Sequence, residues 1–314
     1  MIAELGVTTP IYSTEKIPML RYFQERAGSV LAQDYDFSWV IVDDGSTDET
    51  PDYIRGLKDP RIVFLQRERQ PGDKETSSNA VNSGFNYLFE NGARFFAYVH
   101  SDDFLTPRSL ELRVEEIKNH DMVYGRIGKL YNGEVLGTDY PPEGIDYSSA
   151  GLLDDGFPHH TSMWSRRMME MMLKRRPKGP FNPEVESAED LDVTLYCRRL
   201  IKDRFSLGFV NNFLYIWAGS ENNITSRVSK EQQNKDLKLI YESNGFPELY
   251  KRISKASWKD HFTRFGFWLP DSIRDLLRPG AIFLNNLTSG RLYPNSDPQP
   301  EVINIDPYWF KSSR

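Results

Sequence analysis

Three short acidic segments contain the side chains best suited to bind a metal ion or to remove a proton. They are Asp43-Asp44-Gly45-Ser46, Ser101-Asp102-Asp103 and Ala188-Glu189-Asp190. Adjacent carboxylates such as Asp102 and Asp103 offer the hard oxygen ligands that Mg²⁺ or Mn²⁺ prefers. The alternative is that these acids cap the next helix or lie in solvated turns, where Asp and Gly are common. Taken alone, none of the three segments decides between these interpretations.

The elements around the first two segments predict where they lie. Strand-like runs at 5–9, 39–42, 61–65 and 94–99 alternate with helix-like runs at 16–33, 49–57 and 77–90. This alternation predicts a parallel sheet built from strand-helix-strand units. The first two acidic segments follow the second and fourth of these strands. Because ligands bind beyond the carboxyl ends of strands in open α/β sheets, we expect both segments to line one crevice.

The second half of the chain has a mixed pattern. It predicts strands at 121–127, 130–136 and 212–217 and helices at 165–174 and 188–201. A further helix is predicted to begin at Thr106 and Pro107, a capping residue followed by Pro at the first helical position. Beyond about 226 come a Lys-rich helix, an aromatic segment and a tail with Pro and Asn. We find no internal repeat and expect this half to complete the same α/β body.

Composition narrows the class of protein. The chain has 314 residues, 39% of them hydrophobic and 27% charged, which is typical of a soluble globular protein. Its net charge of −6 gives no overall basic field to attract nucleic acid. Cys197 stands alone, which excludes an intrachain disulfide and favours a reducing compartment. Without a signal-peptide pattern or an apolar run of about 20 residues, we expect a cytoplasmic protein, soluble or peripheral at the inner membrane face.

Five motifs in order carry a family resemblance. They are Thr9-Pro10-Ile11-Tyr12, the segment 42–48 (VDDGSTD), the segment 78–84 (SNAVNSG), Ser101-Asp102-Asp103 and Ala188-Glu189-Asp190. This series resembles family-2 glycosyltransferases, inverting enzymes of the GT-A fold, from residue 5 to about 220. The resemblance implies an α/β fold with a Rossmann-like, mostly parallel sheet flanked by helices, followed by a mainly helical C-terminal extension. It implies a nucleotide-sugar-binding half at 1–110, an acceptor-binding half at 111–225 and the extension at 226–314.

The resemblance also implies roles for single residues. Pro10 and Tyr12 match the loop that borders the nucleotide base, and Asp44 matches the acid that contacts the base or ribose. Asp102 matches the acid near the ribose and sugar, and Asp103 matches the acid that binds the metal. Asp190 matches the catalytic base.

The nucleotide contacts depart from the family at one position. The family often carries Arg immediately before the residue that aligns with Asn79, where this chain has Ser78. Lys74, in the preceding loop, is expected to supply the cation in its place. Asn79 itself is assigned to the nucleotide site.

Other assignments have structural alternatives. The run from Ser187 to Asp190 also fits a helix start, with Ser as the cap and an acid three residues later. His160 is assigned to acceptor or phosphate contacts, against a structural role in a loop, and Glu189 and Trp217 are assigned to the same group of contacts. The loop 218–223 is either a lid over the donor or a plain surface loop.

The expected activity is transfer of a sugar from a UDP-, GDP- or dTDP-linked donor to a carbohydrate or lipid-linked acceptor, as in polysaccharide or glycoconjugate biosynthesis. One carboxylate is sufficient for inversion, and bound Mn²⁺ or Mg²⁺ would stabilise the departing nucleoside diphosphate. A nucleotidyltransferase that makes sugar nucleotides is the alternative enzyme, but residues 5–20 lack the Gly-rich phosphate loop expected of it. A non-catalytic, carbohydrate-binding relative is the other alternative, which the joint presence of Asp102, Asp103 and Asp190 disfavours.

The C-terminal extension contains an amphipathic pattern. Trp258, Phe262, Phe265 and Leu269 recur on one face of a predicted helix. Packing on the catalytic body is the simpler interpretation. The alternative is a peripheral membrane or homo-oligomer contact through 250–285.

Overall fold

The computed structural model describes residues 2–70, 73–74, 76–131, 134–137, 159–202, 205–218, 228–247 and 250. Two predicted segments, the loop 218–223 and the amphipathic contact at 250–285, lie outside these residues except for Ala218 and Tyr250. No helix among the described residues is long and apolar enough to cross a membrane.

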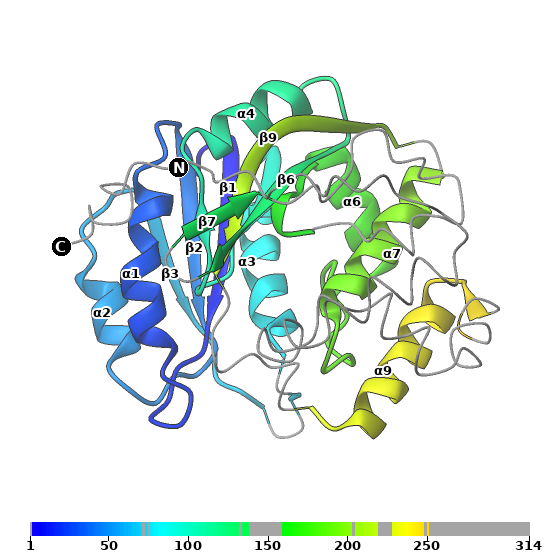
Figure 1. Ribbon diagram of the computed structural model, residues 1–314, viewed down its shortest axis with the longest axis horizontal. Coiled ribbons are helices and arrows are strands. Elements are labelled where there is room, and N and C mark those ends of the chain that lie inside the picture. The colour runs from blue at the N-terminus through cyan, green and yellow to red at the C-terminus, as the bar shows by residue number, and fades with distance from the viewer. Residues whose placement is uncertain are drawn as a thin grey trace, which may run out of the picture.

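A single mixed sheet forms the centre of the molecule (Figure 1). Its described strands are β1 (Leu5–Ile11), β2 (Phe37–Asp43), β3 (Ile62–Gln66), β4 (Phe95–Tyr98), β5 (Phe104–Leu105), β6 (Met122–Tyr131), β7 (Glu134–Gly137), β8 (Met163–Ser165) and β9 (Leu207–Trp217). Their order is β3-β2-β1-β4-β8-β6-β9-β5, with β7 paired to β6. The strands β1 to β4 are parallel, as predicted, whereas β8 is antiparallel to both β4 and β6. Strands from both predicted halves therefore belong to one sheet.

Helices cover both faces of this sheet. The described helices are α1 (Met19–Leu31), α2 (Thr50–Gly56), α3 (Ser78–Glu90), α4 (Ser109–Ile117), α6 (Arg166–Arg175), α7 (Glu189–Lys202) and α9 (Lys230–Ser243), with a 3-10 turn η1 at His159–Thr161. The helices α1, α2 and α4 pack on one face, and α3, α6 and α7 pack on the other (Figure 1). The helix α9 packs on α7, outside these layers.

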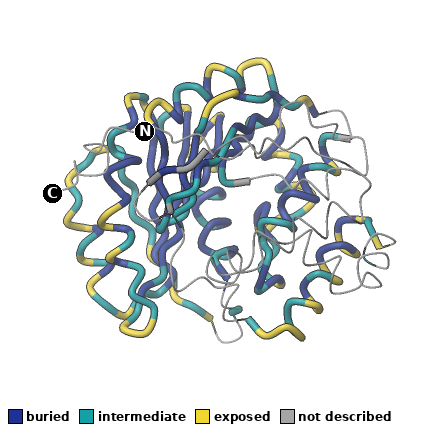
Figure 2. The backbone as a smooth tube through the Cα atoms, viewed as in Figure 1, coloured by how far each residue is buried: buried dark blue, intermediate teal, exposed yellow. Residues whose placement is uncertain are grey.

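The central strands are buried on both sides, which explains their apolar sequences. In β2, Val40 and Val42 pack with α3, whereas Trp39 and Ile41 pack with α1 on the opposite face. Successive side chains of a strand point to opposite faces of the sheet. A strand covered on both faces is therefore apolar along its whole length, as Figure 2 shows for the sheet interior.

Close packing of α3 on the sheet depends on one glycine. A β-carbon at Gly84 would collide with the side chain of Thr8 in β1 and would crowd Val42 in β2. A residue without a side chain at this point lets the helix lie close to both strands. This contact fixes α3, whose N-terminus lies at the same edge of the sheet as the acidic segments.

Three local predictions about element boundaries need correction. The predicted strands at 121–127 and 130–136 are one long strand, β6, and the short partner β7. The strand β8 was not predicted, because three residues are too few to show a periodic pattern. Thr106 does not cap a helix: its hydroxyl donates to the carbonyl of Phe213 at 2.5 Å, and α4 begins two residues after Pro107.

An ion pair joins the helices of the second half. The guanidinium of Arg176, which follows α6, donates to Asp192 of α7 at 2.6 Å, and the Asp192 side chain is fully buried. The side chain of Asn244, which follows α9, accepts from Arg176 and donates to Asp192. Three helices therefore share one buried polar contact.

Replacing Asp192 with Ala is expected to lower the free energy of unfolding by about 3–5 kcal/mol, because a largely buried Arg176 would lose its carboxylate partner. Urea unfolding followed by circular dichroism measures the change. Asp52→Ala is the matched control, since Asp52 also pairs with an arginine but is 86% exposed, and exposed pairs contribute about 0–1 kcal/mol. Equal losses in the two variants would contradict a stabilising role for the buried pair.

Candidate functional site

The carboxyl ends of β1, β2 and β3 place three segments side by side. Ile11 is aligned with Asp43, and Asp43 is aligned with Gln66. Past these positions, the backbone N–H of Asp44 donates to Ile11, and that of Arg67 donates to Asp43. The residues that follow all three strands therefore form one continuous edge, as the crevice hypothesis requires.

Two arginines bind the carboxylate of Asp44. This residue is 2% exposed, and Arg67 donates to its Oδ1 while Arg69 donates to its Oδ2 at 2.8 Å. Burial raises the pKa of Asp44, and the two guanidinium groups oppose that shift. The turn itself needs Gly45, whose φ of 83° is in the left-handed region. Asp44 thus lies at the predicted edge with its oxygens already engaged.

Neither arginine was identified from the sequence. Arg69 lies over the ring of Tyr12, with 4.0 Å between the guanidinium carbon and the ring centroid. Arg67 also donates to Asp73 at 2.6 Å, and the amide of Asn79 donates to the other oxygen of Asp73 at 3.3 Å. The sequence offered one indication of this pairing. Two basic residues follow the third strand, and an acidic turn follows the second strand beside it.

The adjacent acids Asp102 and Asp103 have different environments. Asp103 is 3% exposed, and its carboxylate accepts from the hydroxyl of Tyr215 at 2.9 Å and from the backbone N–H of Ala218 at 2.8 Å. Asp102 is partly exposed and has no hydrogen bond or ion pair to any other described residue. The two acids thus differ in accessibility, and the assignment of the metal to Asp103 stays a prediction.

A cluster of aromatic and histidine rings lies beside these acids. The ring of His100 lies 4.9 Å from that of His160, which in turn lies 5.3 Å from the ring of Tyr215. The hydroxyl of Tyr98 lies 2.7 Å from Nε2 of His100. Burial lowers the pKa of His100 to about 4, so this ring is neutral at physiological pH. The fold brings His160 to the same edge as the acidic turn.

The N-terminus of α7 carries Glu189 and Asp190. Ser187 is not the cap of this helix, because Ala188 stands directly before Glu189, and the Ser187 hydroxyl donates to Asp236 at 2.8 Å. Glu189 accepts from the hydroxyl of Ser77 at 3.1 Å, and Asp190 accepts from the backbone N–H of its neighbour Leu191 at 2.8 Å. Burial, followed by the charge of Asp190, raises the pKa of Glu189 to about 7, and burial also raises the pKa of Asp190. Both acids thus bind protons more tightly than ordinary carboxyl groups.

Two other predicted contacts have partners within the protein. Lys74 pairs with Glu186 at 2.8 Å, which joins two loops, and its assignment to the nucleotide stays a prediction. Trp217 ends β9, and the ammonium of Lys129 lies 5.1 Å from the centroid of its ring. Trp217 is partly exposed next to Ala218, whose N–H binds Asp103.

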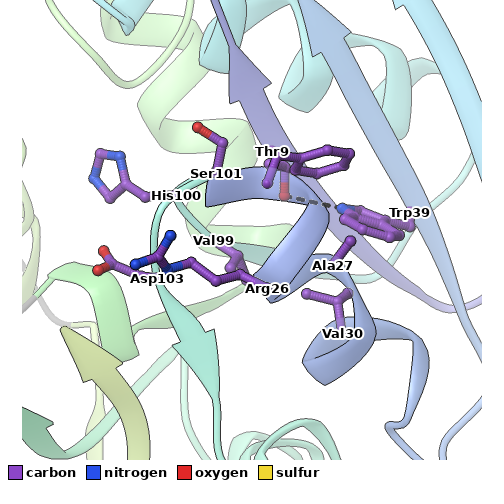
Figure 3. Close-up of a pocket in the computed structure, with 10 residues that line it drawn as sticks. Thr9, Arg26, Ala27, Val30, Trp39, Val99, His100, Ser101 and Asp103 are labelled. Atoms are coloured by element: carbon purple, nitrogen blue, oxygen red, sulfur yellow. Dashed lines mark hydrogen bonds between the residues drawn. The ribbon is translucent and has the colours of Figure 1, made fainter. Parts of the chain in front are cut away.

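A narrow space, too small to hold a water molecule, lies behind the acidic turn (Figure 3). It is lined by Thr9, Phe23, Arg26, Ala27, Val30, Trp39, Val99, His100, Ser101 and Asp103. Arg26 is the cation and Asp103 the carboxylate among these lining residues, and the Arg26 side chain extends from α1 toward Asp103. Arg26 is 6% exposed, and its Nε and Nη1 have no hydrogen-bond partner among the described residues. Arg26 and Asp103 are thus buried charges of opposite sign that line the same narrow space, while Nη1 of Arg26 lies 3.6 Å from the carboxylate of Glu25.

Comparison with known proteins agrees with this architecture. The sequence model of glycosyl transferase family 2 matches residues 18–172. The chain carries a family 2 glycosyltransferase domain. The family resemblance inferred from the ordered motifs is thereby confirmed, and this domain includes the acidic turns at 43–46 and 101–103.

Two curated proteins are similar in sequence to this chain. An uncharacterised glycosyltransferase of Methanocaldococcus jannaschii is 22% identical over 221 residues, which cover 68% of this chain and 71% of that protein. An uncharacterised protein of Sinorhizobium fredii is 25% identical over 223 residues, which cover 68% of this chain. The match spans 22% of the length of the S. fredii protein.

Solved structures confirm the GT-A fold. The structure of S. aureus TarS 1–349 in complex with UDP-GlcNAc matches with a TM-score of 0.60 and 17% identity, covering 97% of this chain and 100% of that chain. The complex of the same fragment with UDP matches with a TM-score of 0.59 and 16% identity. Another structure of the fragment gives a TM-score of 0.57 and 18% identity, over 76% of this chain and 64% of that chain.

In this glycosyltransferase domain, Arg26→Met and Asp103→Asn are expected to be coupled. Each single substitution removes one of two opposite buried charges that line the same narrow space, whereas the double variant removes both charges. The double variant should therefore lose less stability than the sum of the single losses, by about 0.5–3 kcal/mol. Denaturant unfolding of all four proteins measures this coupling. Additive losses would show that the two groups do not interact.

Proposed function

We propose that this chain is an inverting, hexosyltransferase-type enzyme that moves a sugar from a nucleoside-diphosphate sugar to a hydroxyl group of a carbohydrate or lipid-linked acceptor. One observation carries this proposal: carboxylates from two separate elements converge at one edge of the sheet. Burial raises the pKa of Tyr98, the charges of Glu189, Asp102 and Asp103 raise it further, and a hydrogen bond with Ser77 lowers it. The donor turn and the start of α7 thus lie within electrostatic range of each other.

The donor is proposed to lie along the carboxyl ends of β1 to β4. Pro10, Tyr12 and Asp44 would border the base and ribose, and Asn79 would contribute a polar contact next to them. The fold match to TarS crystallised with UDP-GlcNAc and UDP supports a nucleotide-sugar donor. UDP-, GDP- and dTDP-linked sugars are all candidates for this site.

Asp102 is the residue proposed to hold Mn²⁺ or Mg²⁺. It offers a carboxylate that no other described residue engages, and hard oxygen ligands suit both cations. Among the described residues, no group of three or more His, Cys, Asp or Glu side chains gathers as a metal site. The residues fit a cation that takes most of its ligands from a diphosphate and water, as Mg²⁺ commonly does. Such a cation would neutralise charge on the departing diphosphate.

Asp190 is proposed as the general base. Its carboxylate would take the proton of the acceptor hydroxyl as that oxygen attacks the anomeric carbon, and the bond from that carbon to the diphosphate oxygen would break. The electron pair of the broken bond leaves with the nucleoside diphosphate, so a single in-line step inverts the anomeric centre. Burial raises the pKa of Asp190, which makes the carboxylate a better proton acceptor. Glu189, His160 and Trp217 are proposed to contact the acceptor or the phosphates.

Asp190→Asn is expected to lower kcat by about 10²–10⁴-fold, because the variant retains the shape of the residue but cannot accept the proton. The assay measures release of nucleoside diphosphate from UDP-, GDP- and dTDP-sugars with Mn²⁺ and a panel of hydroxyl acceptors. Glu189→Gln is the matched comparison at the neighbouring position and should retain more activity. Unchanged transfer by Asp190→Asn would exclude this residue as the base.

Asp102→Asn is expected to raise the Mn²⁺ concentration needed for half-maximal activity by at least about tenfold, because a charged oxygen ligand is lost. Titration of Mn²⁺ into EDTA-treated enzyme measures this requirement. Asp103→Asn serves as the comparison, since its oxygens already accept hydrogen bonds from Tyr215 and Ala218. A larger shift in Asp103→Asn would restore the metal to the position that the family resemblance implies.

A further inference from the structure

Arg69 bridges the two residues that border the proposed base site. Its Nε and Nη2 donate to Oδ2 of Asp44 at 3.1 and 2.8 Å, and its Nε also lies 3.2 Å from the backbone carbonyl oxygen of Asp44. The same guanidinium lies 4.0 Å from the ring centroid of Tyr12, within the range of a cation–π contact. The plane of Arg69 is therefore fixed on one side by a carboxylate and on another by an aromatic ring.

The remaining nitrogen of this guanidinium is available to a ligand. Nη1 of Arg69 has no hydrogen-bond partner among the described residues, and it is not one of their buried unsatisfied atoms, so it faces solvent. The Arg69 side chain is 24% exposed. Arg67 differs, because its Nη1 donates to Asp44 and its Nη2 to Asp73. Of this arginine pair, Arg69 is the one that points a free donor out of the cluster.

The local charge balance argues against a phosphate at this position. Arg67 and Arg69 are matched by Asp44 and Asp73, so the four groups together carry no net charge. A free N–H of a neutral cluster suits a neutral acceptor such as a carbonyl oxygen. A diphosphate would gain more from a cation at the Asp102 turn.

The spacing of the strands allows the base and the phosphates of one donor to occupy separate positions. Asp44 follows β2 and Asp102 follows β4, with β1 between them. Adjacent strands lie about 4.8 Å apart, so the two turns are separated by roughly 10 Å. A nucleoside diphosphate laid across the strand ends can therefore place its base near Arg69 and its phosphates near Asp102.

We propose that Arg69 recognises the nucleobase of the donor, its Nη1 donating to a ring carbonyl oxygen while Tyr12 supports the guanidinium from behind. This inference rests on the proposed donor function. Uracil, thymine and guanine carry a carbonyl on the edge they present, whereas adenine carries an amino group in its place. The site therefore selects nucleotides with a carbonyl-bearing base and disfavours adenine nucleotides.

Calorimetric titration of the full chain with UDP, GDP and ADP in the presence of Mn²⁺ tests this assignment. The wild-type protein should bind UDP or GDP roughly 10- to 100-fold more tightly than ADP, the range expected for one hydrogen bond to a charged group. Arg69→Ala should bring that ratio close to one. Arg69→Gln, which keeps a planar amide donor, should retain part of the preference.

Two features of the design keep the outcome interpretable. The ratio of two affinities is measured on one preparation, so a partly unfolded fraction of Arg69→Ala cancels. Arg108→Ala is the matched control, because Arg108 is 61% exposed and pairs only with Glu111 within the described α4 region. Its ratio should equal that of the wild type.

The inference is overturned if Arg69→Ala keeps the wild-type ratio, or if the wild type binds ADP as tightly as UDP and GDP. Either result can occur in an enzyme that still releases nucleoside diphosphate from a sugar donor, in which case the proposed function stands and the role of Arg69 fails. A wild-type protein that binds no nucleotide and turns over no donor would overturn both.

Discussion

The buried carboxylate of Asp103 is the interaction on which the site depends. A carboxylate with 3% exposure needs hydrogen-bond donors inside the protein, because losing its hydration without them costs several kcal/mol. The donors come from Tyr215 and Ala218, more than a hundred residues later in the chain. The short pairing of β5 with β9 brings them into place, since Phe104 is aligned with Ile216 and Leu105 with Tyr215. The turn is thereby held with Asp102 on its outer side.

The acids at this edge of the sheet differ in the groups that stabilise them. Asp44 is neutralised by two arginines, and Asp103 is bound by a hydroxyl and a backbone N–H. The pKa of Glu189 is raised to about 7, because the side chain is buried and lies near the charge of Asp190. Asp102 alone of this group has no bonded partner among the described residues. Similar side chains therefore acquire different chemical capacities from their surroundings.

The segment that leads into α7 is fixed by the first half of the chain. Asn82 of α3 exchanges two hydrogen bonds with the backbone of Phe181, and Ser77 donates to Glu189. The ion pair between Lys74 and Glu186 is a further link between the loop before α3 and the segment before α7. These contacts join the start of α7 to the loop before α3, although the two segments are more than a hundred residues apart in the chain.

The sequence by itself determined that the first four strands are parallel and that two acidic turns follow the second and fourth of them. Those features depend on local patterns: apolar runs of strand length, each closed by residues that turns require. Its five ordered motifs also identified the family. Tertiary structure alone decided which of two adjacent acids is buried, because the groups that bind Asp103 come from Tyr215 and Ala218, far away in the chain.

The partners of Lys74, Thr106 and Ser187 likewise lay beyond the sequence, since each hydroxyl or ammonium group bonds to a residue at least 49 positions away. In the sequence, Arg67 and Arg69 resemble ordinary surface residues. Only the fold shows that both pair with Asp44. Local chemistry thus fixes where a functional group stands along the chain. Its partners, and so its charge and accessibility, are fixed only when distant segments pack together and exclude water.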